Sequence, residues 1–331
     1  MPGTLRWGIL GPGGIAEAQT SDLISNGFTV TAVGSRSIES ARRFAERFGI
    51  PAAHGSYREL VEDPQVDIVY VATPHAFHYE QARMALEAGK HVLVEKAFTV
   101  TAQQATALAD LAEESGLVVL EAMWTRYLPH MVRLREIIAA GTIGEVRTLI
   151  ADHNQKLPSD PGHRLNDKAL AGGALLDLGI YPISLAWDIF GEPVSIKADA
   201  AMSETGVDRQ TAVILGYAGG RQAVVHTALD TAGPTTAAIL GTDGWIAIDS
   251  VWYAPAALTV YDGAGETIER FERQVAPRGM QFQAAELERL VTEGLTAGEV
   301  LPPRESARIM ATLDEIRRLI GLEYPADIMK V

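Results

Sequence analysis

The sequence of 331 residues contains no cysteine, and this absence excludes several kinds of chemistry. Without thiols the chain can form no disulfide, no thiolate nucleophile and no metal site with cysteine ligands, and we expect no bound metal. Basic residues are also few, because 28 Lys and Arg stand against 42 Asp and Glu, a formal net charge of −14. Binding to nucleic acid requires clustered positive charge, so this balance argues against a nucleic-acid partner.

Long apolar runs are missing as well. No stretch approaches the roughly 18 consecutive apolar residues that mark a membrane span. Nor does the N-terminus carry the basic segment and cleavage site of a secretory signal, so we expect a cytoplasmic protein with no membrane partner. The hydrophobic share of 47% and the charged share of 21% are ordinary for a globular protein, and the length suggests two domains.

The N-terminal segment has the pattern of a strand, a tight turn and a helix start. Residues 5–10 form a short apolar run that is typical of a buried strand, and residues 15–24 have helical periodicity. Between them, Gly11, Gly13 and Ala16 match the G-x-G-x-x-G/A pattern of dinucleotide-binding folds. In that pattern the glycines let the backbone approach a pyrophosphate, which then faces the N–H groups of the helix N-terminus.

A second strand is predicted over residues 28–34 and ends in Ser35, Arg36 and Ser37. Arg36 follows Ala16 by 20 residues, where NAD-preferring proteins usually carry an acid that accepts a hydrogen bond from the ribose 2′-hydroxyl. An arginine there instead accommodates a 2′-phosphate. We therefore predict NADP as the cofactor, with NAD as the less favoured alternative. A solvated surface arginine is the plainer interpretation of the same residue.

The order of predicted strands and helices differs between the two parts of the chain. Up to about residue 122, short apolar runs alternate with helical patterns, which predicts a parallel sheet with helices on both faces. The runs lie at 28–33, 68–72, 92–94 and 118–120, and the helical patterns at 38–48, 57–62, 77–88 and 102–115. Beyond this, strand-like segments separated by turn signals predict a mostly antiparallel sheet with helices on one face. These segments lie near 146–155, 194–203, 210–217, 222–229, 235–240 and 244–249, and the helical patterns near 130–140, 173–190 and 302–320.

The predicted fold class therefore combines two architectures. Residues 1–123 are expected to form an α/β Rossmann domain, with a doubly wound parallel sheet, that binds the dinucleotide. Residues 124–331 are expected to form an α+β domain, with a large and mostly antiparallel open sheet, that binds substrate and mediates oligomerisation.

Ligands of an open parallel sheet bind beyond the carboxyl ends of its strands, so three segments that follow predicted strands are candidates for chemistry. They are residues 73–78, 95–97 and 121–126. Pro74 can start a helix that holds His78 in its first turn, where the helix dipole favours a neutral imidazole beside the cofactor over an imidazolium. A surface histidine is the plainer alternative. Lys96 would lie near the nicotinamide, although Glu95 and Lys96 could equally form a surface ion pair.

In the second half, residues 171–181 read as a helix that starts at glycines. Asp177 and Tyr181 are four residues apart and would share one face, where an acid and a phenol could hold a substrate hydroxyl. A purely structural pair is the commoner outcome at this spacing. His163 and Arg164 could contact hydroxyls too, but a solvated loop is the plainer interpretation of that segment.

Four motifs, in this order, make the chain resemble the Gfo/Idh/MocA oxidoreductase family over nearly its whole length. They are Gly-Pro-Gly-Gly-Ile-Ala at 11–16, Thr-Pro-His-Ala-Phe-His at 73–78, Glu-Lys at 95–96, and the run from Gly172 to Tyr181. Residues 121–127 and 179–181 are similar to the branch of dimeric dihydrodiol dehydrogenases and NADP-dependent D-xylose dehydrogenases. The resemblance implies that Lys96 and Tyr181 are catalytic and that Asp177 binds substrate. Many family members have histidine where Tyr181 stands.

The cofactor site predicted from the motifs, the strand ends and the resemblance is extensive. Its expected residues are Gly11, Pro12, Gly13, Gly14, Ile15, Ser35, Arg36, Ser37, Thr73, Pro74, His75, His78, Glu95, Lys96, Trp124 and Arg126. By resemblance, Trp124 and Arg126 would line the nicotinamide site. The family motif usually continues from the lysine to a proline, which Ala97 replaces here. Because a cis bond before another residue costs about 2.5 to 4 kcal/mol, we expect a trans bond and a slightly shifted Lys96.

The expected activity is NADP-dependent hydride transfer between the nicotinamide and a carbinol or carbonyl carbon of a sugar, polyol or trans-dihydrodiol. Tyr181 would be the general acid/base, assisted by Lys96. Two alternatives remain: a noncatalytic NADP-binding redox regulator, and an enzyme that uses transient hydride transfer for elimination or glycosyl cleavage. The expected partners are a small polyhydroxy or diol substrate and further copies of the chain. A homodimer or higher homo-oligomer would cover the sheet face that the helices leave open.

Overall fold

The computed structural model describes residue 3 and residues 5–331, which divide into two compact units. Unit 1 comprises the chain up to Trp124 together with residues 276–310 and 328–331. Unit 2 comprises residues 125–275 and 311–327. The first crossing falls beside the boundary drawn at residue 123, but two later segments return to unit 1. The two compact units therefore do not correspond to a division of the chain at a single residue.

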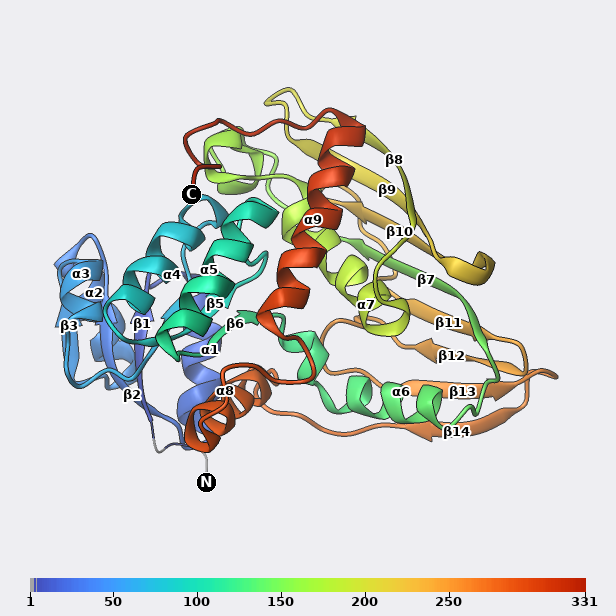
Figure 1. The fold of residues 1–331 in the computed structure, drawn as a ribbon, viewed down its shortest axis with the longest axis horizontal. Coiled ribbons are helices and arrows are strands. Elements are labelled where there is room, and N and C mark those ends of the chain that lie inside the picture. Colours follow the sequence, from blue (N-terminus) through green and yellow to red (C-terminus); the bar gives the residue numbers. More distant parts are fainter. Residues whose placement is uncertain (1–2, 4) are drawn as a thin grey trace. The chain divides into compact units, whose positions relative to one another are not determined.

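Unit 1 contains a six-stranded, fully parallel sheet with the strand order β3-β2-β1-β4-β5-β6. Its strands are β1 (Arg6–Leu10), β2 (Thr29–Gly34), β3 (Ala52–His54), β4 (Ile68–Val71), β5 (His91–Glu95) and β6 (Val119–Ala122). Its helices are α1 (Gly14–Ser25), α2 (Ile38–Phe48), α3 (Tyr57–Val61), α4 (His78–Glu87), α5 (Ala102–Ser115) and α8 (Gln281–Glu293). The doubly wound parallel sheet is confirmed, and the colours of Figure 1 follow its strands and helices along the chain. The strand order reverses between β1 and β4.

The returning helix α8 belongs to unit 1 because it completes the apolar core on one face of the sheet. Leu287 and Leu290 are buried in the same cluster as Trp7 of β1. The indole Nε1 of Trp7 also donates to Glu288 Oε1 at 2.9 Å, and both groups are buried. Burial of this apolar surface, rather than sequence proximity, places α8 in unit 1.

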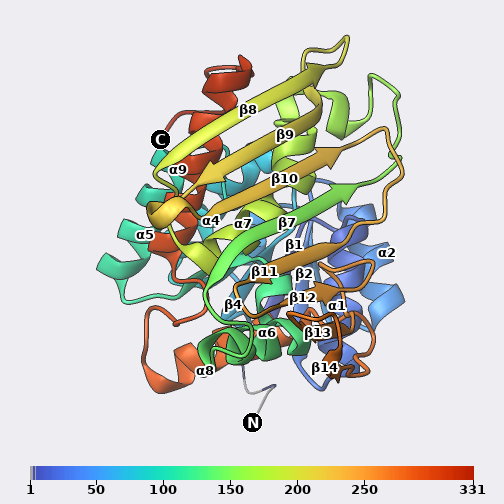
Figure 2. The same ribbon diagram turned by 90° about the vertical axis from the view of Figure 1, so that its right-hand side faces the viewer.

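Unit 2 contains an eight-stranded sheet with the order β14-β13-β12-β11-β7-β10-β9-β8, in which only β7 and β10 pair in parallel. Its strands are β7 (Val146–Asn154), β8 (Ser195–Met202), β9 (Asp208–Gly216), β10 (Gln222–Ala228), β11 (Ala237–Gly241), β12 (Gly244–Ile248), β13 (Leu258–Asp262) and β14 (Thr267–Phe271). Figure 2 shows these strands with helices α6 (Pro129–Ala139) and α7 (Ile180–Phe190) behind them. The predicted large, mostly antiparallel sheet is confirmed.

The last helix, α9 (Pro303–Ile320), runs from unit 1 into unit 2. A five-residue π-helical segment, η5 (Leu175–Gly179), leads directly into α7. The stretch Lys168–Phe190 is long and apolar enough to span a membrane, with a mean hydropathy of 1.5 in its most apolar window. Asp177 and Asp188 interrupt it, so it is not a run of 18 consecutive apolar residues, and the expectation about such runs is unaffected. This composition reflects burial, because 89% of that window lies inside the protein.

Candidate active site

The glycine-rich turn after β1 has the geometry of a phosphate-binding loop. Gly11 has φ +93°, and a Cβ there would come within 2.9 Å of Thr73 Cγ2, so no other residue fits. Gly13 and Gly14 are exposed, and a Cβ on either would meet no atom within 4 Å. Gly13 is the N-cap of α1 and offers no side-chain acceptor to the first-turn N–H groups. Open space beside such N–H groups is what a pyrophosphate requires, so the turn fits a dinucleotide.

The predicted ribose-binding segment lies next to this turn, because Gly11 N donates to Gly34 O at 3.0 Å. The guanidinium of Arg36 is exposed and forms no hydrogen bond or ion pair with any residue that the structure describes. The two flanking hydroxyls have local contacts: Ser37 caps α2 by accepting from Ser40 N, and Ser35 Oγ accepts from Ser37 N, both at 3.3 Å. Arg36 is therefore the side chain of the three that is available to an anion.

His78 joins the loops that follow β4 and β5. Its buried ring places Nε2 2.8 Å from Thr73 O and Nδ1 2.8 Å from Ala97 O. Both neighbours are acceptors, so the expected neutral imidazole, with one N–H, could donate to only one of them. His75 is buried as well and packs edge-on against His78, with centroids 5.5 Å apart. The predicted residues 73–78, of which His75, Ala76 and His78 are buried, thus lie beside the glycine turn, where Thr73 Cγ2 faces Gly11.

Lys96 follows β5 on a backbone that neighbouring groups fix tightly. Glu95 is buried, accepts from Tyr70 Oη, and accepts from Lys96 N at 3.2 Å, so its carboxylate does not lie on the surface. The Lys96–Ala97 peptide bond is cis, and the expectation of a trans bond is wrong. The reason is tertiary: the Ala97 carbonyl faces His78, while Phe98 N donates to Glu121 Oε1 at 3.1 Å. The general preference of a bond before a non-proline residue for the trans form does not take these contacts into account.

Trp124 and Arg126, predicted to line the nicotinamide site, lie in different units. Trp124 is buried in unit 1, and the Arg278 guanidinium lies 5.9 Å from its ring centroid. Arg126 is buried in unit 2, where it donates to Asp188 Oδ1 at 2.9 Å and to Ser184 Oγ and O at 3.0 and 2.8 Å. These contacts hold α7, which carries Tyr181. They give Arg126 a structural role that the sequence did not indicate.

Asp177 lies in the π-helical segment η5, so the α-helical spacing that placed it on one face with Tyr181 does not apply there. Its buried Oδ1 accepts from both terminal nitrogens of Arg164 at 3.3 Å. The guanidinium of Arg164 remains about half exposed. Arg164, interpreted as part of a solvated loop, is thus partly solvated and also pairs with Asp177. Asp177 and Arg164 together offer a carboxylate oxygen and N–H donors to a hydroxyl-bearing ligand.

Tyr181 is buried in an aromatic cluster that sequence reasoning missed. Its ring centroid lies 5.1 Å from that of His153 and 4.9 Å from that of Tyr253, and the latter two stack at 4.1 Å. Gln155 Nε2 lies 2.8 Å from both His153 Nε2 and Tyr253 Oη. The one signal available from the sequence was the strand predicted near 146–155, because the two-residue period of a strand puts His153 on the same face as Leu149, and the structure buries both. Tyr253 follows the predicted strands in a segment without a recognisable pattern.

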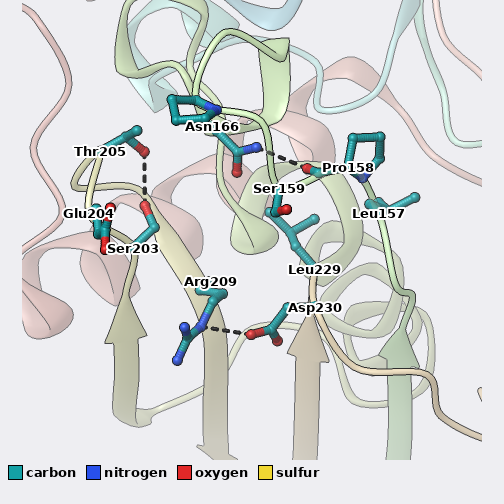
Figure 3. A pocket seen from close by; sticks show the side chains of 11 residues that line it. Leu157, Pro158, Ser159, Asn166, Ser203, Glu204, Thr205, Arg209, Leu229 and Asp230 are labelled. Atoms are coloured by element: carbon teal, nitrogen blue, oxygen red, sulfur yellow. Dashed lines mark hydrogen bonds and ion pairs between the residues drawn. The ribbon is translucent and has the colours of Figure 1, made fainter.

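A separate pocket of about 220 Å³ opens in unit 2 near the ends of β8, β9 and β10 (Figure 3). Arg209 and Asp230 form an ion pair of 2.8 Å at its edge, and Asn166 Nδ2 donates to Pro158 O at 2.9 Å. None of the residues predicted for the site lines this pocket. Among the residues that the structure describes, no three His, Asp or Glu side chains gather as they would around a metal ion.

The fold and these residues define the class: an oxidoreductase with a dinucleotide-binding Rossmann unit and a second unit built on a large open sheet. Residues 5–123 match the model of the oxidoreductase family with an NAD-binding Rossmann fold. Residues 131–247 match the Gfo/Idh/MocA C-terminal domain. The chain belongs to the Gfo/Idh/MocA family of oxidoreductases, and the resemblance drawn from its motifs is confirmed.

Several relatives match almost the whole chain. A trans-1,2-dihydrobenzene-1,2-diol dehydrogenase from Mus musculus is 37% identical, over 98% of this chain and 99% of its own length. A D-xylose 1-dehydrogenase (NADP+) from Hypocrea jecorina is 36% identical, over 98% and 94%.

Solved structures are similar over nearly the full length too. A 3-ketoreductase from Actinomadura kijaniata in complex with NADP and TDP-benzene has a TM-score of 0.84 at 28% identity, covering 97% of this chain and 98% of its own. An aldose-aldose oxidoreductase from Caulobacter crescentus in complex with glycerol has a TM-score of 0.85 at 26% identity, covering 96% and 97%. The protein therefore belongs among oxidoreductases whose named members act on sugar or diol hydroxyl groups.

Proposed function

We propose that the protein is an NADP-dependent dehydrogenase that acts on a carbinol carbon of a sugar, polyol or trans-dihydrodiol. The observation that carries the cofactor part is Arg36, an exposed guanidinium without a partner among the described residues, which follows β2 where a ribose-reading residue is expected. The named activities of the relatives support the substrate class. Unit 1 would bind the dinucleotide, and unit 2 would bind the substrate.

The residues of unit 1 are suited to hold the cofactor. The backbone at Gly13 and Gly14 would face the pyrophosphate, and Arg36 would pair with the 2′-phosphate through charge-assisted hydrogen bonds. When bound, the cofactor supplies the acceptor for hydride in alcohol oxidation. The remaining predicted residues of this unit, His75, His78 and Glu95, would act mainly by holding the loops on which the nicotinamide lies.

The residues of unit 2 would bind the substrate and accept its hydroxyl proton. Asp177 and Arg164 would bind hydroxyl groups, and Tyr181 would remove the hydroxyl proton as the general base. A free phenol has a pKa of about 10 and is a poor base at neutral pH, so the reaction needs a cation that stabilises the phenolate. We assign this role to the ammonium of Lys96. A cation in contact supplies about 4 kcal/mol at an effective dielectric of about 20, which equals about three pKa units.

A substrate panel tests the proposal. Pentoses, hexoses, inositols and trans-dihydrodiols are each mixed with NADP⁺, and the absorbance of the reduced cofactor is followed. Net accumulation of NADPH with at least one of them is the expected result. NADP⁺ binding without net reduction by any of these alcohols would instead favour a redox regulator or an enzyme with transient hydride transfer.

We also propose a homodimer that assembles through the open face of the unit 2 sheet. Ile150, Ile214 and Val224 are 49%, 42% and 39% exposed and lie side by side in register on β7, β9 and β10. Ala238 and Ala247 extend this apolar row across β11 and β12. A twofold axis is the commonest way to bury such a face. Light scattering should give twice the 35.6 kDa of one chain, and a monomer mass at micromolar concentration would contradict the proposal.

A further inference from the structure

The segment that carries Asp177 and Tyr181 starts at two glycines whose side-chain positions are already filled. A Cβ on Gly172 would lie 2.5 Å from Leu165 O, and a Cβ on Gly173 would lie 2.1 Å from Asp208 Oδ1. Gly173 also has φ +121°, a conformation that other residues rarely adopt. The start of this segment is therefore set by what packs against it.

Asp208, the first residue of β9, reaches this start from the sheet. Its carboxyl is fully buried, and Oδ2 accepts from Leu175 N at 2.8 Å and from Thr211 Oγ1 at 2.7 Å. Leu175 is the first residue of η5, and Asp177 lies two residues further on. The other oxygen, Oδ1, has no hydrogen-bond partner among the described residues. The carboxyl thus acts as an N-terminal cap supplied from a neighbouring strand.

The same turn is held from a second direction. Tyr324, after the end of α9, is buried and donates through its hydroxyl to Gly172 O at 2.6 Å. The guanidinium of Arg317 lies 5.2 Å from the Tyr324 ring centroid. Tyr324 is the titratable group that faces Asp208 from this side, and Arg317 in turn lies over Tyr324. Burial raises the pKa of Asp208 to about 7, and burial followed by the charge of Asp208 raises the pKa of Tyr324.

Stability alone does not account for an acid in this place. A fully buried carboxyl with one oxygen lacking a partner is costly, and a well-packed apolar side chain would avoid that cost. Buried groups of this kind are commonly retained where they hold a functional segment in one conformation. Besides Thr211 of its own strand, Asp208 binds the backbone immediately before Asp177, at Leu175 N.

We propose that Asp208 is a positioning residue that fixes η5 and the start of α7, and thereby the places of Asp177 and Tyr181 within unit 2. The inference rests on the proposed function, in which these two residues act on the substrate. Substitution of Asp208 should therefore impair substrate binding and turnover while the cofactor still binds. The hydrogen bonds of this carboxyl are to groups of unit 2, whereas the residues expected to hold the cofactor phosphates, Gly13, Gly14 and Arg36, belong to unit 1.

The test compares Asp208→Asn with a matched control, Asp199→Asn, which removes a carboxylate from the exposed side of β8. Three quantities are measured: amide hydrogen exchange of residues 173–181, the Kd of NADP⁺, and KM and kcat with the best alcohol of the panel. For Asp208→Asn we expect exchange at least tenfold faster, KM at least fivefold higher and a Kd within twofold of the native value. Asp199→Asn should change none of them.

Thr211→Val is the second variant, used if Asp208→Asn does not fold. It removes one hydrogen bond to Asp208 and leaves the one from Leu175 N, so the same changes should appear at smaller amplitude. Faster exchange with native KM and kcat would overturn the proposal, because Asp208 would then be merely structural. Native exchange in Asp208→Asn would overturn it independently of activity. Failure of the native enzyme on every alcohol, with exchange altered as expected, would count against the proposed function alone.

Discussion

In each unit a pair of adjacent glycines lies at the start of a functional helical segment: Gly13 and Gly14 are the N-cap and first residue of α1, and Gly172 and Gly173 come shortly before η5. A Cβ on either glycine of the first pair would meet no atom within 4 Å. A Cβ on either glycine of the second pair would lie within 2.5 Å of another group. The first pair keeps space free for a ligand to reach the backbone, and the second keeps space for the protein's own carbonyl and carboxyl groups. The same residue type thus serves binding in unit 1 and positioning in unit 2.

The difference between the two glycine pairs should be largest in the free energy of unfolding of their alanine variants. Gly173→Ala combines an unfavourable φ with a clash against Asp208, and we expect it to lower the free energy of unfolding by about 3 kcal/mol. Gly14→Ala is the matched control, because its Cβ enters open space at the first helical residue and should change stability by less than about 1 kcal/mol. Chemical denaturation measures both. Equal losses in the two variants would break the comparison.

Catalysis should depend on Tyr181 of unit 2, whereas the affinity for NADP⁺ should not. Tyr181→Phe is expected to lower kcat for alcohol oxidation by about 10²-fold or more, with little change in the Kd of NADP⁺. Lys96→Met should do similar harm and move the acid-side limb of the pH profile upward, because the tyrosine regains its ordinary pKa. Steady-state kinetics across pH measure both effects. Near-native turnover in Tyr181→Phe would transfer the role of base to Asp177 or to a water that it holds.

Cofactor choice should depend on unit 1 alone. Native enzyme should prefer NADP⁺ over NAD⁺ by at least roughly tenfold in kcat/KM, since charge-assisted hydrogen bonds to a phosphate contribute about 1.5 to 3 kcal/mol each. Arg36→Asp should reverse this preference and leave KM for the alcohol near its native value. Equal efficiency of the native enzyme with both cofactors would contradict the role given to Arg36.

The smallest expected effect is the pH dependence of stability that Asp208 contributes. Its pKa is about 7 in the folded protein and near 3.8 when unfolded, so the folded state binds the proton more tightly. This stabilisation is complete below the unfolded pKa and is lost as pH rises through about 7. The free energy of unfolding of Asp208→Asn should therefore rise relative to native by about 1 kcal/mol or more between pH 5 and pH 8. If the difference in the free energy of unfolding between Asp208→Asn and native protein were the same at pH 5 and pH 8, the raised pKa of Asp208 would be contradicted.

Most of the fold could be predicted because its hydrophobic patterning is local. Five of the six parallel strands of unit 1, and the six strands of the unit 2 sheet that come first in the chain, follow from apolar runs and turn signals. The missed elements were β3, which has three residues, the strand β13 and its neighbour β14 at one edge of the unit 2 sheet, and α8. The inclusion of α8 in unit 1 depends on packing against Trp7, more than 270 residues earlier in the chain, and no local pattern reports it.

The candidate site could be predicted only as far as its motifs reach. The glycine turn, Arg36 and the family residues Lys96, Asp177 and Tyr181 stand in recognisable runs of sequence. Contacts between segments could not be predicted, among them Arg164 on Asp177 and Asp208 on the Gly172–Leu175 turn. The cis bond after Lys96 belongs to the same group, since groups on α4 and β6 hold the backbone there.

The central claim is that the open glycine pair of unit 1 receives the pyrophosphate of NADP, and one titration tests it most directly. NADP⁺ is added to native protein and to Gly13→Ala, and the Kd of each is measured from the quenching of tryptophan fluorescence. A Cβ at Gly13 would enter the space next to the first-turn N–H groups. The account predicts a Kd at least tenfold higher in Gly13→Ala with an unchanged unfolding midpoint. An unchanged Kd would contradict it.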